Sequence, residues 1–310
     1  MTYPQFPIIS DEMRIRRLQP PAGKVNMVLD TDTFNEIDDQ FALVYALLSQ
    51  DKINLQAVYA APFYNSLSEG PKDGMEKSYD EIVRILTRLN VPVDGFIFRG
   101  SESYLPEKGK PVESEAVRDL IAKAMAAPDD EPLYVVAIGA ITNVASAILL
   151  EPRIISKIVV VWLGGHALDW KDTKEFNLEQ DVPAVQAVFD CGVPLVLVPC
   201  LGVASHLLTS LPEIERYVRG KGAIGDFLAE RYEGCCDDHF GYSRVIWDIS
   251  VIAWLLNEAW IPSALVPSPV VTDQVTWSKD ATRHLIRAAY FANRDPIFKD
   301  LFAKLAKAAE

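Results

Sequence analysis

Six stretches of the chain are apolar almost throughout, and segments with helical periodicity separate them. Continuous apolar runs are typical of strands that are buried on both faces, as in a parallel sheet covered by helices. The alternation therefore predicts an α/β fold with a doubly wound, mostly parallel central sheet flanked by helices. The predicted strands are 25–30, 55–61, 95–100, 133–139, 157–165 and 193–200. The predicted helices between them are 38–50, 74–90, 113–127, 141–151 and 181–191.

Beyond residue 205 the pattern becomes mostly helical, which predicts helical insertions in the same fold. The elements expected there are helices over 211–233 and 246–259, a short strand within 263–272, and a C-terminal helix over 294–309. Residues 1–24, which close with "QPPAGK", are expected to form an N-terminal arm. Because no shift in composition and no internal repeat divides the remainder, residues 25–310 are predicted to form a single domain.

The composition chiefly excludes certain partners and locations for the protein. With 49% apolar residues, the chain of 310 residues can bury a large core. Its net charge of −13 argues against nucleic acid and anionic membrane surfaces as partners, because both require clustered cations. The sequence has no apolar run long enough for a membrane span, no signal-peptide core and no metal-ligand spacing among its four cysteines. We therefore expect a soluble protein of a reducing cytoplasm.

An acidic cluster follows the first predicted strand, in the segment "NMVLDTDTFNEIDDQFALVYALLS" (26–49). Its members are Asp30, Asp32, Glu36, Asp38 and Asp39. Parallel strands end at one edge of the sheet, where ligands bind. The N-terminus of the following helix offsets only about 0.3–1 kcal/mol per exposed carboxylate. A bound cation can offset more, and a set of ligands made of oxygen alone favours Ca²⁺ or Mg²⁺.

Three other interpretations of the cluster compete with a metal site. A solvated acidic loop before a capped helix is the simplest. An EF-hand loop is excluded, because "DTDTFNEIDDQF" has no Gly at its sixth position and no Glu at its twelfth. A phosphotransferase matches "VLDTDT", but it requires a later lysine and a second acidic pair at strand ends, which the segments "AIGAITN" and "WLGGHA" do not supply.

The cluster and later segments resemble a known family, the calcium-dependent nucleoside hydrolases, which cleave the N-glycosidic bond of ribonucleosides. In that family the first strand usually ends in DxDPGxDD, whereas this chain has "DTDTFNEIDD", which is two residues longer and resembles a divergent subgroup. The similarity extends from about residue 25 to about residue 260. It implies the fold of that family, a Ca²⁺ cofactor, a small-molecule riboside or sugar as substrate, and a homo-oligomer, either a dimer or a tetramer.

When the family's site residues are carried over to the matching positions of this sequence, the resemblance implies a metal site. Asp32 matches the metal ligand that also acts as general base, and Asp39 matches the bidentate metal carboxylate. Asp248, in "RVIWDISVIAWLL", matches the aspartate that closes the site. The main-chain carbonyl of Ile138, in "AIGAITN", matches the backbone ligand.

The resemblance also assigns substrate-binding positions. These are Asp30, Asp38, Asn65, Asp169, Glu175 and Asn177. Glu175 and Asn177, in "KEFNLEQD", match residues that bind the sugar hydroxyls, and Asp169 falls near the position for the 5′-hydroxyl. Asn65, in "APFYN", matches an asparagine that contacts ribose after the second strand.

The side that receives the leaving group departs from the family pattern. Many members have His directly before the last metal aspartate, as the acid for the leaving group, and this chain has Trp247 there. A Trp ring can stack on a base but cannot usefully give up a proton. His239 is the histidine nearest to this segment in sequence, and it is either a replacement acid or a surface residue. His166, at a strand end, is a second candidate for the pocket.

These assignments predict a hydrolase in which Asp32 accepts a proton from the water that attacks C1 of the sugar, through an oxocarbenium-like transition state. Two alternatives stay open. The chain acts on another furanosyl or sugar substrate, which the altered leaving-group side favours, or it binds a sugar without catalysis.

Overall fold

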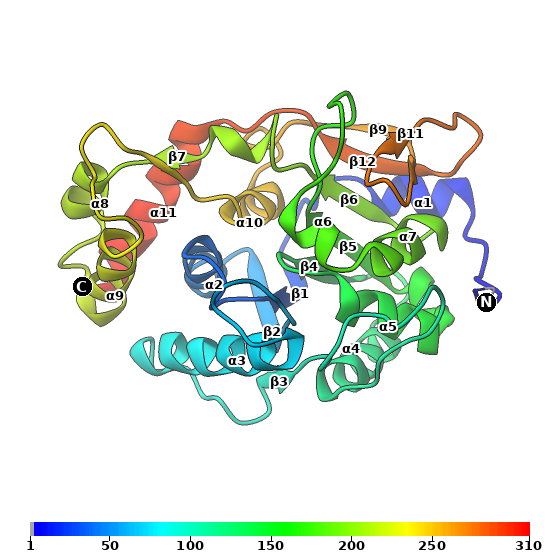
Figure 1. Cartoon of the computed structure of the whole chain (residues 1–310), viewed down its shortest axis with the longest axis horizontal. Helices are drawn as coiled ribbons and strands as arrows, with labels where there is room; N and C mark the ends of the chain where they lie inside the picture. The colour runs from blue at the N-terminus through cyan, green and yellow to red at the C-terminus, as the bar shows by residue number, and fades with distance from the viewer. Residues whose placement is uncertain (1–2) are drawn as a thin grey trace.

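The computed structural model describes residues 3–310, and an eight-stranded sheet forms the centre of this part of the chain (Figure 1). Neighbouring strands pair in parallel except for the last pair, in which β9 runs antiparallel to β12. In spatial order the strands are β3 (Ile97–Arg99), β2 (Ile53–Ala60), β1 (Val25–Thr31), β4 (Leu133–Ala137), β5 (Ile158–Leu163), β6 (Leu195–Val198), β12 (Leu285–Ala289) and β9 (Ser263–Pro267). The predicted doubly wound, mostly parallel sheet is confirmed.

Helices cover both faces of the sheet, because successive strand residues point into two separate apolar cores. In β1, Met27 and Leu29 belong to the first core, and Val28 belongs to the second. The helices of the first core are α2 (Asp38–Leu47), α3 (Pro71–Arg88), α8 (Leu211–Tyr217), α9 (Gly222–Glu233), α10 (Ile249–Leu256) and α11 (Arg294–Ala308). The helices of the second are α4 (Glu115–Ala126), α5 (Thr142–Leu150) and α7 (Val182–Asp190).

Short elements complete the fold. These are α1 (Asp11–Arg17), α6 (Phe176–Gln180), the 3₁₀ helices η1 (Pro152–Ser156) and η2 (Ala204–His206), and the strands β7 (Leu208–Thr209), β8 (Arg244–Val245), β10 (Val270–Val271) and β11 (Trp277–Ser278). The strand β7 pairs with β8, and β10 pairs with β11. None of the helices within residues 3–310 combines the length and the apolar character that crossing a membrane requires.

The six strands predicted first correspond to β1 to β6, but two details of the prediction for the later part of the chain are wrong. The helix expected over 211–233 is two helices, α8 and α9, because Gly220, which lies between them, and Gly222, the first residue of α9, adopt φ values of 76° and 69°. The strand β12 was not predicted. Within the predicted arm, residues 11–17 form α1, whose Arg14 is buried and donates a hydrogen bond of 2.7 Å to the carbonyl oxygen of Gly192.

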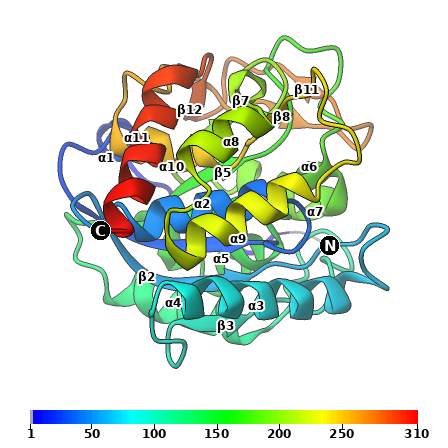
Figure 2. The same ribbon diagram turned by 90° about the vertical axis from the view of Figure 1, so that its left-hand side faces the viewer.

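The helical insertions lie at one end of the molecule, where Figure 2 shows α8, α9 and α11 near one another. The chain leaves β1 toward β2 and β3, and later returns to β4 on the other side of β1. The point between β1 and β4 is therefore the switch at which an open α/β sheet leaves a crevice. The segments that follow β1, β4, β5 and β6 meet at this edge.

Gly74 in α3 packs closely against the backbone of Phe63, and a substitution there can test this packing. A Cβ atom at Gly74 would lie 2.0 Å from the carbonyl oxygen of Phe63, whereas a Cβ atom at Gly70 would meet nothing within 4 Å. We expect Gly74→Ala to lower the free energy of unfolding by about 2 kcal/mol, because overpacking outweighs the gain in helix propensity. Gly70→Ala, the control, should change it by less than about 1 kcal/mol. Equal values for the two variants in denaturant unfolding would contradict this packing.

Candidate functional site

A cavity of about 330 Å³ opens at the carboxyl edge of the sheet. Its walls come from the segments that follow β1, β4, β5 and β6 and from the start of α10, so residues far apart in sequence meet there. Eight of the residues with predicted site roles line it: Asp32, Asp38, Asp39, Ile138, Glu175, Asn177, Trp247 and Asp248. The cavity thus occupies the switch point between β1 and β4.

Two residues with predicted site roles, Asp30 and Asn65, do not line the cavity but lie behind the residues that do. Asp30 is fully buried, and its Oδ1 accepts a hydrogen bond of 2.7 Å from Nδ2 of Asn143. Asn65 contacts Asn35, which lines the cavity, through a hydrogen bond of 2.6 Å between the two side chains. The predicted contacts of Asp30 and Asn65 with a sugar stay predictions.

Two further predicted residues lie away from the lining. Asp169 is exposed, and His239 lies between α9 and β8, with its Nε2 2.9 Å from the carbonyl oxygen of Glu233. Among the four histidines, all within residues 3–310, only His166 lines the cavity. The Nδ1 atom of His166 accepts a hydrogen bond of 3.4 Å from the backbone N–H of Leu201, and burial lowers the pKa of the ring. The ring is therefore neutral at pH 7.

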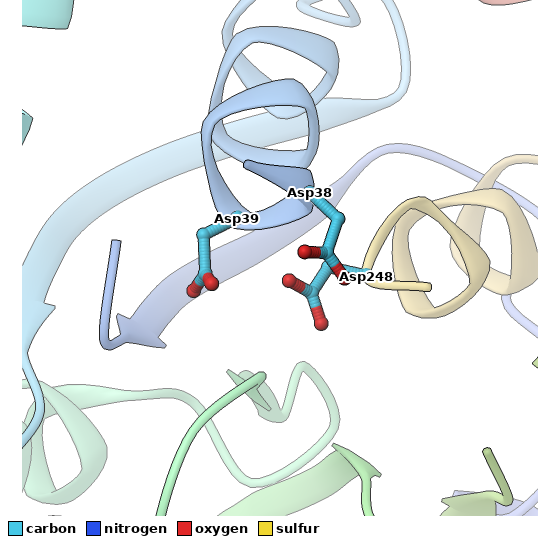
Figure 3. Close-up of side chains that lie close together, drawn as sticks. All are labelled: Asp38, Asp39 and Asp248. Carbon is cyan, nitrogen blue, oxygen red and sulfur yellow. The ribbon is translucent and has the colours of Figure 1, made fainter. Parts of the chain in front are cut away.

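Three buried carboxylates converge on the cavity (Figure 3). Asp38, Asp39 and Asp248 each offer an oxygen atom within 4.8 Å of the others. Asp38 and Asp39 lie in the first turn of α2, and Asp248 is the N-cap residue of α10, so two helix N-termini direct partial positive charge at the group. Thr31 donates a hydrogen bond of 2.6 Å to Asp39, and the backbone N–H of Trp247 donates one of 3.2 Å to Asp38.

A fourth carboxylate, that of Asp32, lies beside Asp39 and is 1% exposed. Neither of its side-chain oxygens has a hydrogen-bond partner within the described part of the chain. A Cβ atom at Gly139 would lie 2.9 Å from Oδ1 of Asp32, so glycine at 139 leaves room for the carboxylate against the segment after β4. Asp32 therefore reaches the main chain that carries Ile138.

Burial makes these carboxylates hard to ionise. Burial first, and then the charge of neighbouring carboxylates, holds the pKa of Asp32, Asp38 and Asp248 well above the usual range. Burial also raises the pKa of Asp30 and of Asp39 to about 7. Among residues 3–310, one oxygen of Asp30, both of Asp32 and one of Asp38 are buried without a partner.

The donor set fits a hard divalent cation. Carboxylates and a main-chain carbonyl supply oxygen ligands only, which Ca²⁺ and Mg²⁺ prefer. A cation would also satisfy the buried oxygens that lack partners and relieve the mutual repulsion. Asp38, which the resemblance assigns to substrate binding, belongs to the close group of three, whereas Asp32 lies beside that group.

Glu175 and Asn177 shape the opposite wall through contacts with the backbone. Glu175 is the N-cap residue of α6, where it accepts hydrogen bonds from the backbone N–H groups of Gly165, Asn177 and Leu178. Burial raises its pKa to about 7. Asn177 Nδ2 donates to the carbonyl oxygens of Ile138 and Leu163, at 3.2 and 3.1 Å, and so fixes the predicted backbone ligand.

Several lining residues were not identified from the sequence: Asn35, Leu163, Lys174, Phe176, Cys200 and Leu201. The thiol of Cys200 lies against Glu175, and burial holds its pKa well above its usual range, so it stays protonated. The segment "ITN" contained a usable signal, because its Asn143 orients Asp30. Asn35, Lys174 and Phe176 lie within the quoted segments "DTDTFNEIDD" and "KEFNLEQD", which could have pointed to them. For Leu163, Cys200 and Leu201, the sequence gives no pattern that points to the cavity.

Residues 71–293 match the family model described as inosine-uridine preferring nucleoside hydrolase, and the chain belongs to this family. Membership supports hydrolysis of the N-glycosidic bond of a ribonucleoside, and the family is known for a metal cofactor. The predicted resemblance is therefore confirmed. The matched range contains Ile138, Glu175, Asn177 and Asp248, but it begins after the acidic cluster.

Relatives and solved structures agree with this family. The chain is 25% identical to probable uridine nucleosidase 2 of Arabidopsis thaliana over 260 residues, which are 78% of each chain. It is 29% identical to the pyrimidine-specific ribonucleoside hydrolase RihA of Klebsiella pneumoniae (strain 342), over 74% of this chain and 79% of that one. A purine-preferring ribonucleoside hydrolase from Gardnerella vaginalis shares the fold, with a TM-score of 0.73 and 19% identity over 92% and 99% of the two chains.

The raised pKa values predict how pH and metal ions act on stability. These carboxyl groups bind protons more tightly in the folded chain, so metal-free protein should lose stability as the pH rises from about 4 toward 7. Excess Ca²⁺ or Mg²⁺ should raise the thermal unfolding midpoint at about pH 8 and much less at about pH 5, where protons compete for the carboxylates. The midpoint should be measured with chelator and with each ion. An equal response at both pH values would contradict a carboxylate metal site.

Proposed function

We propose that this chain hydrolyses the N-glycosidic bond of a ribonucleoside with the help of a bound Ca²⁺ ion. The observation that carries the proposal is the set of buried carboxylate oxygens without partners, within residues 3–310, beside a cavity of about 330 Å³. Asp32, Asp39, Asp248 and the carbonyl of Ile138 would hold the ion, with Asp38 close to them. When bound, the ion supplies positive charge that favours ionisation of water and attracts the vicinal hydroxyls of a ribose.

The chain's own residues perform the remaining work. Asp32 accepts the proton of the water that attacks C1 of the sugar, and the absence of other partners among the described residues keeps both of its oxygens available. As the bond to the base lengthens, positive charge develops on the sugar, and the neighbouring carboxylates stabilise that charge. Asn143 keeps Asp30 oriented behind them. Trp247, which is half-buried in the lining, offers an aromatic face to the base.

Help for the leaving group comes from His166 rather than from His239. The proposal rests on position, because His166 lines the cavity and His239 does not. Since Nδ1 of His166 accepts from Leu201, the proton of the neutral ring is on Nε2. The ring therefore assists the departing base by donating a hydrogen bond.

A pyrimidine ribonucleoside is the substrate that the names of the two sequence relatives favour. The two sequence relatives described above are named as a probable uridine nucleosidase and a pyrimidine-specific ribonucleoside hydrolase. Uridine and cytidine are therefore the first substrates to assay, with inosine as the purine comparison. Cleavage of aryl ribosides without turnover of any nucleoside would favour the alternative, a hydrolase of another furanoside.

The experiment that tests this function compares Asp32→Asn with Asp94→Asn, a control at an exposed position away from the cavity. We expect Asp32→Asn to lower kcat for uridine hydrolysis by about 10²-fold or more, because the amide cannot accept the proton from water. Asp94→Asn should retain the activity of the unaltered chain, and chelation should abolish that activity until Ca²⁺ is restored. Hydrolysis that is indifferent to Asp32→Asn and to chelation would refute the mechanism.

A second experiment separates the two histidines. We expect His166→Ala to lower kcat for uridine by about tenfold, the loss of one hydrogen bond in the transition state. The same variant should retain most of its rate on p-nitrophenyl riboside, whose leaving group needs little assistance. His239→Ala is the matched control and should leave both rates unchanged. An equal loss on the two substrates would show that His166 maintains the shape of the cavity instead.

A further inference from the structure

The segment from Thr33 to Ile37, between β1 and α2, carries the two residues by which this chain exceeds the DxDPGxDD pattern. Asn35 and Glu36 from this segment line the cavity. The backbone N–H of Asn35 donates a hydrogen bond of 2.7 Å to the carbonyl oxygen of Asp32, which forms a tight turn directly after the carboxylate of Asp32. The turn is followed by an amide side chain, that of Asn35, which lines the same cavity as the carboxylates.

Asn65, the asparagine assigned to ribose from the sequence, makes hydrogen bonds to protein groups with both ends of its amide. Its Oδ1 accepts a hydrogen bond of 2.8 Å from the backbone N–H of Leu67. That contact fixes the orientation of the amide, so its Nδ2 donates the hydrogen bond of 2.6 Å to Oδ1 of Asn35. Asn65 is also absent from the cavity lining.

The same hydrogen bond determines what Asn35 presents to the cavity. Because Oδ1 of Asn35 accepts from Asn65, the group that remains is the Nδ2 amide, which has two N–H donors. Within residues 3–310, no protein group accepts a hydrogen bond from this Nδ2, and the side chain is half-buried in the lining. A fixed donor therefore faces the cavity that Asp32 also lines.

The other side of the segment is held as well. Nη2 of Arg244 pairs with Oε2 of Glu36 at 2.8 Å, and the side chain of Arg244 is more buried than that of Glu36. Two interactions thus hold Asn35 in place: its own hydrogen bond to Asn65 and the ion pair of its neighbour Glu36 with Arg244. A donor that is fixed before the substrate arrives loses little entropy on binding.

We infer that Asn35, and not Asn65, is the amide that binds the furanose ring, and that Asn65 is a positioning residue that orients it. This inference rests on the proposed function, because it names the sugar-recognition residue of that site. Its N–H donors suit the lone pairs of a sugar hydroxyl, whereas the carboxylates around it can only accept. Asn35 therefore selects for a furanose hydroxyl within the cavity that Asp32 lines.

The test pairs protein variants with substrates that lack one hydroxyl. Asn35→Ala and Asn65→Ala are assayed, singly and combined, on a uridine series that includes the 2′-, 3′- and 5′-deoxy analogues. We expect Asn35→Ala to lower kcat/KM for uridine by about fivefold to tenfold, the loss of one hydrogen bond. The loss should vanish on the one analogue that lacks the bonded hydroxyl. Since Asn65 acts through Asn35, Asn65→Ala should add little to Asn35→Ala in the double variant.

The chain offers a matched control in a second pair of asparagines. Asn54 donates a hydrogen bond of 2.8 Å to Asn26 near the N-terminal ends of β2 and β1, at the sheet edge opposite to the cavity. Asn54→Ala should leave every rate unchanged. Equal losses by Asn35→Ala on uridine and on all three analogues, or fully additive losses for Asn35 and Asn65, would overturn the inference while the proposed function stands. Absence of turnover by the unaltered chain on every riboside would overturn both.

Discussion

The repulsion among buried carboxylates at the end of β1 is the constraint that organises this molecule. Two unit charges roughly 4 Å apart repel by about 4 kcal/mol at an effective dielectric constant of about 20. Asp38, Asp39 and Asp248 form three such neighbouring pairs, and Asp32 lies beside Asp39. A helix N-terminus offsets at most about 2 kcal/mol in a favourable, partly buried site. The two helix termini at the group therefore leave most of the repulsion to protons or to a cation.

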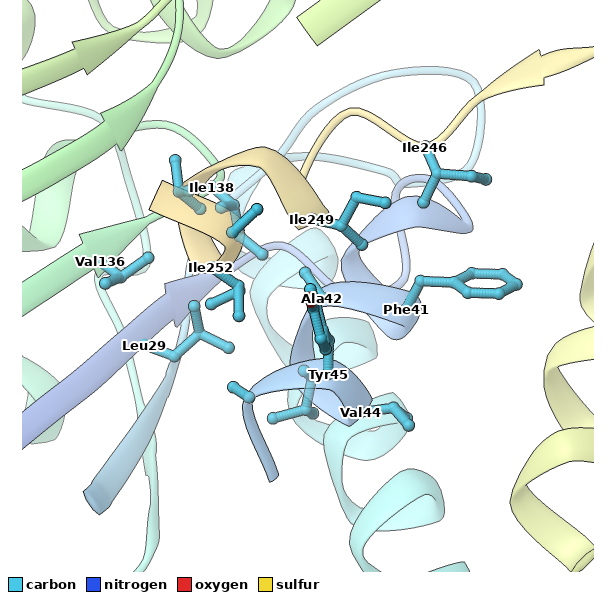
Figure 4. Packing of buried hydrophobic residues seen from close by; sticks show 14 of the residues in the cluster. Leu29, Phe41, Ala42, Val44, Tyr45, Val136, Ile138, Ile246, Ile249 and Ile252 are labelled. Atoms are coloured by element: carbon cyan, nitrogen blue, oxygen red, sulfur yellow. The ribbon is translucent and has the colours of Figure 1, made fainter. Parts of the chain in front are cut away.

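The apolar core makes this unfavourable arrangement possible. Leu29 and Ile138 at the sheet edge and Ile249 and Ile252 of α10 pack in one cluster with Phe41 and Tyr45 of α2 (Figure 4). Burial of such side chains stabilises the fold by about 1.5–3 kcal/mol each. The packing holds the starts of α2 and α10 together. It therefore also holds the aspartates at those starts close to one another. Hydrophobic packing thus creates a site whose charge only a ligand can balance.

The sequence predicts what depends on periodicity and fails where single contacts decide. Continuous apolar runs identified β1 to β6, and the rule that parallel strands end at one edge placed Asp30 and Asp32 at the site. The family resemblance, and not the apolar pattern, supplied Ile138 and Asp248. The strand β12 was missed because Arg287 interrupts its apolar run. That guanidinium is tolerated in the sheet because it donates to the carbonyl oxygens of Leu18 and Ser263. No periodic pattern encodes such contacts between distant carbonyl groups.

The position of Asn65 shows a second reason why transfer by sequence position has a limit. Transfer assumes that the backbone carries each side chain to the same place, and a loop that is two residues longer breaks that assumption locally. In this chain the longer segment brings Asn35 into the cavity, and Asn65 turns its amide to Asn35. Asparagine is thus retained at position 65, but the amide that lines the cavity is that of Asn35. The aspartates are less affected because a strand end and two helix starts, both fixed by the core, hold them. Residues on packed elements are therefore predicted more reliably than residues on the loops between them.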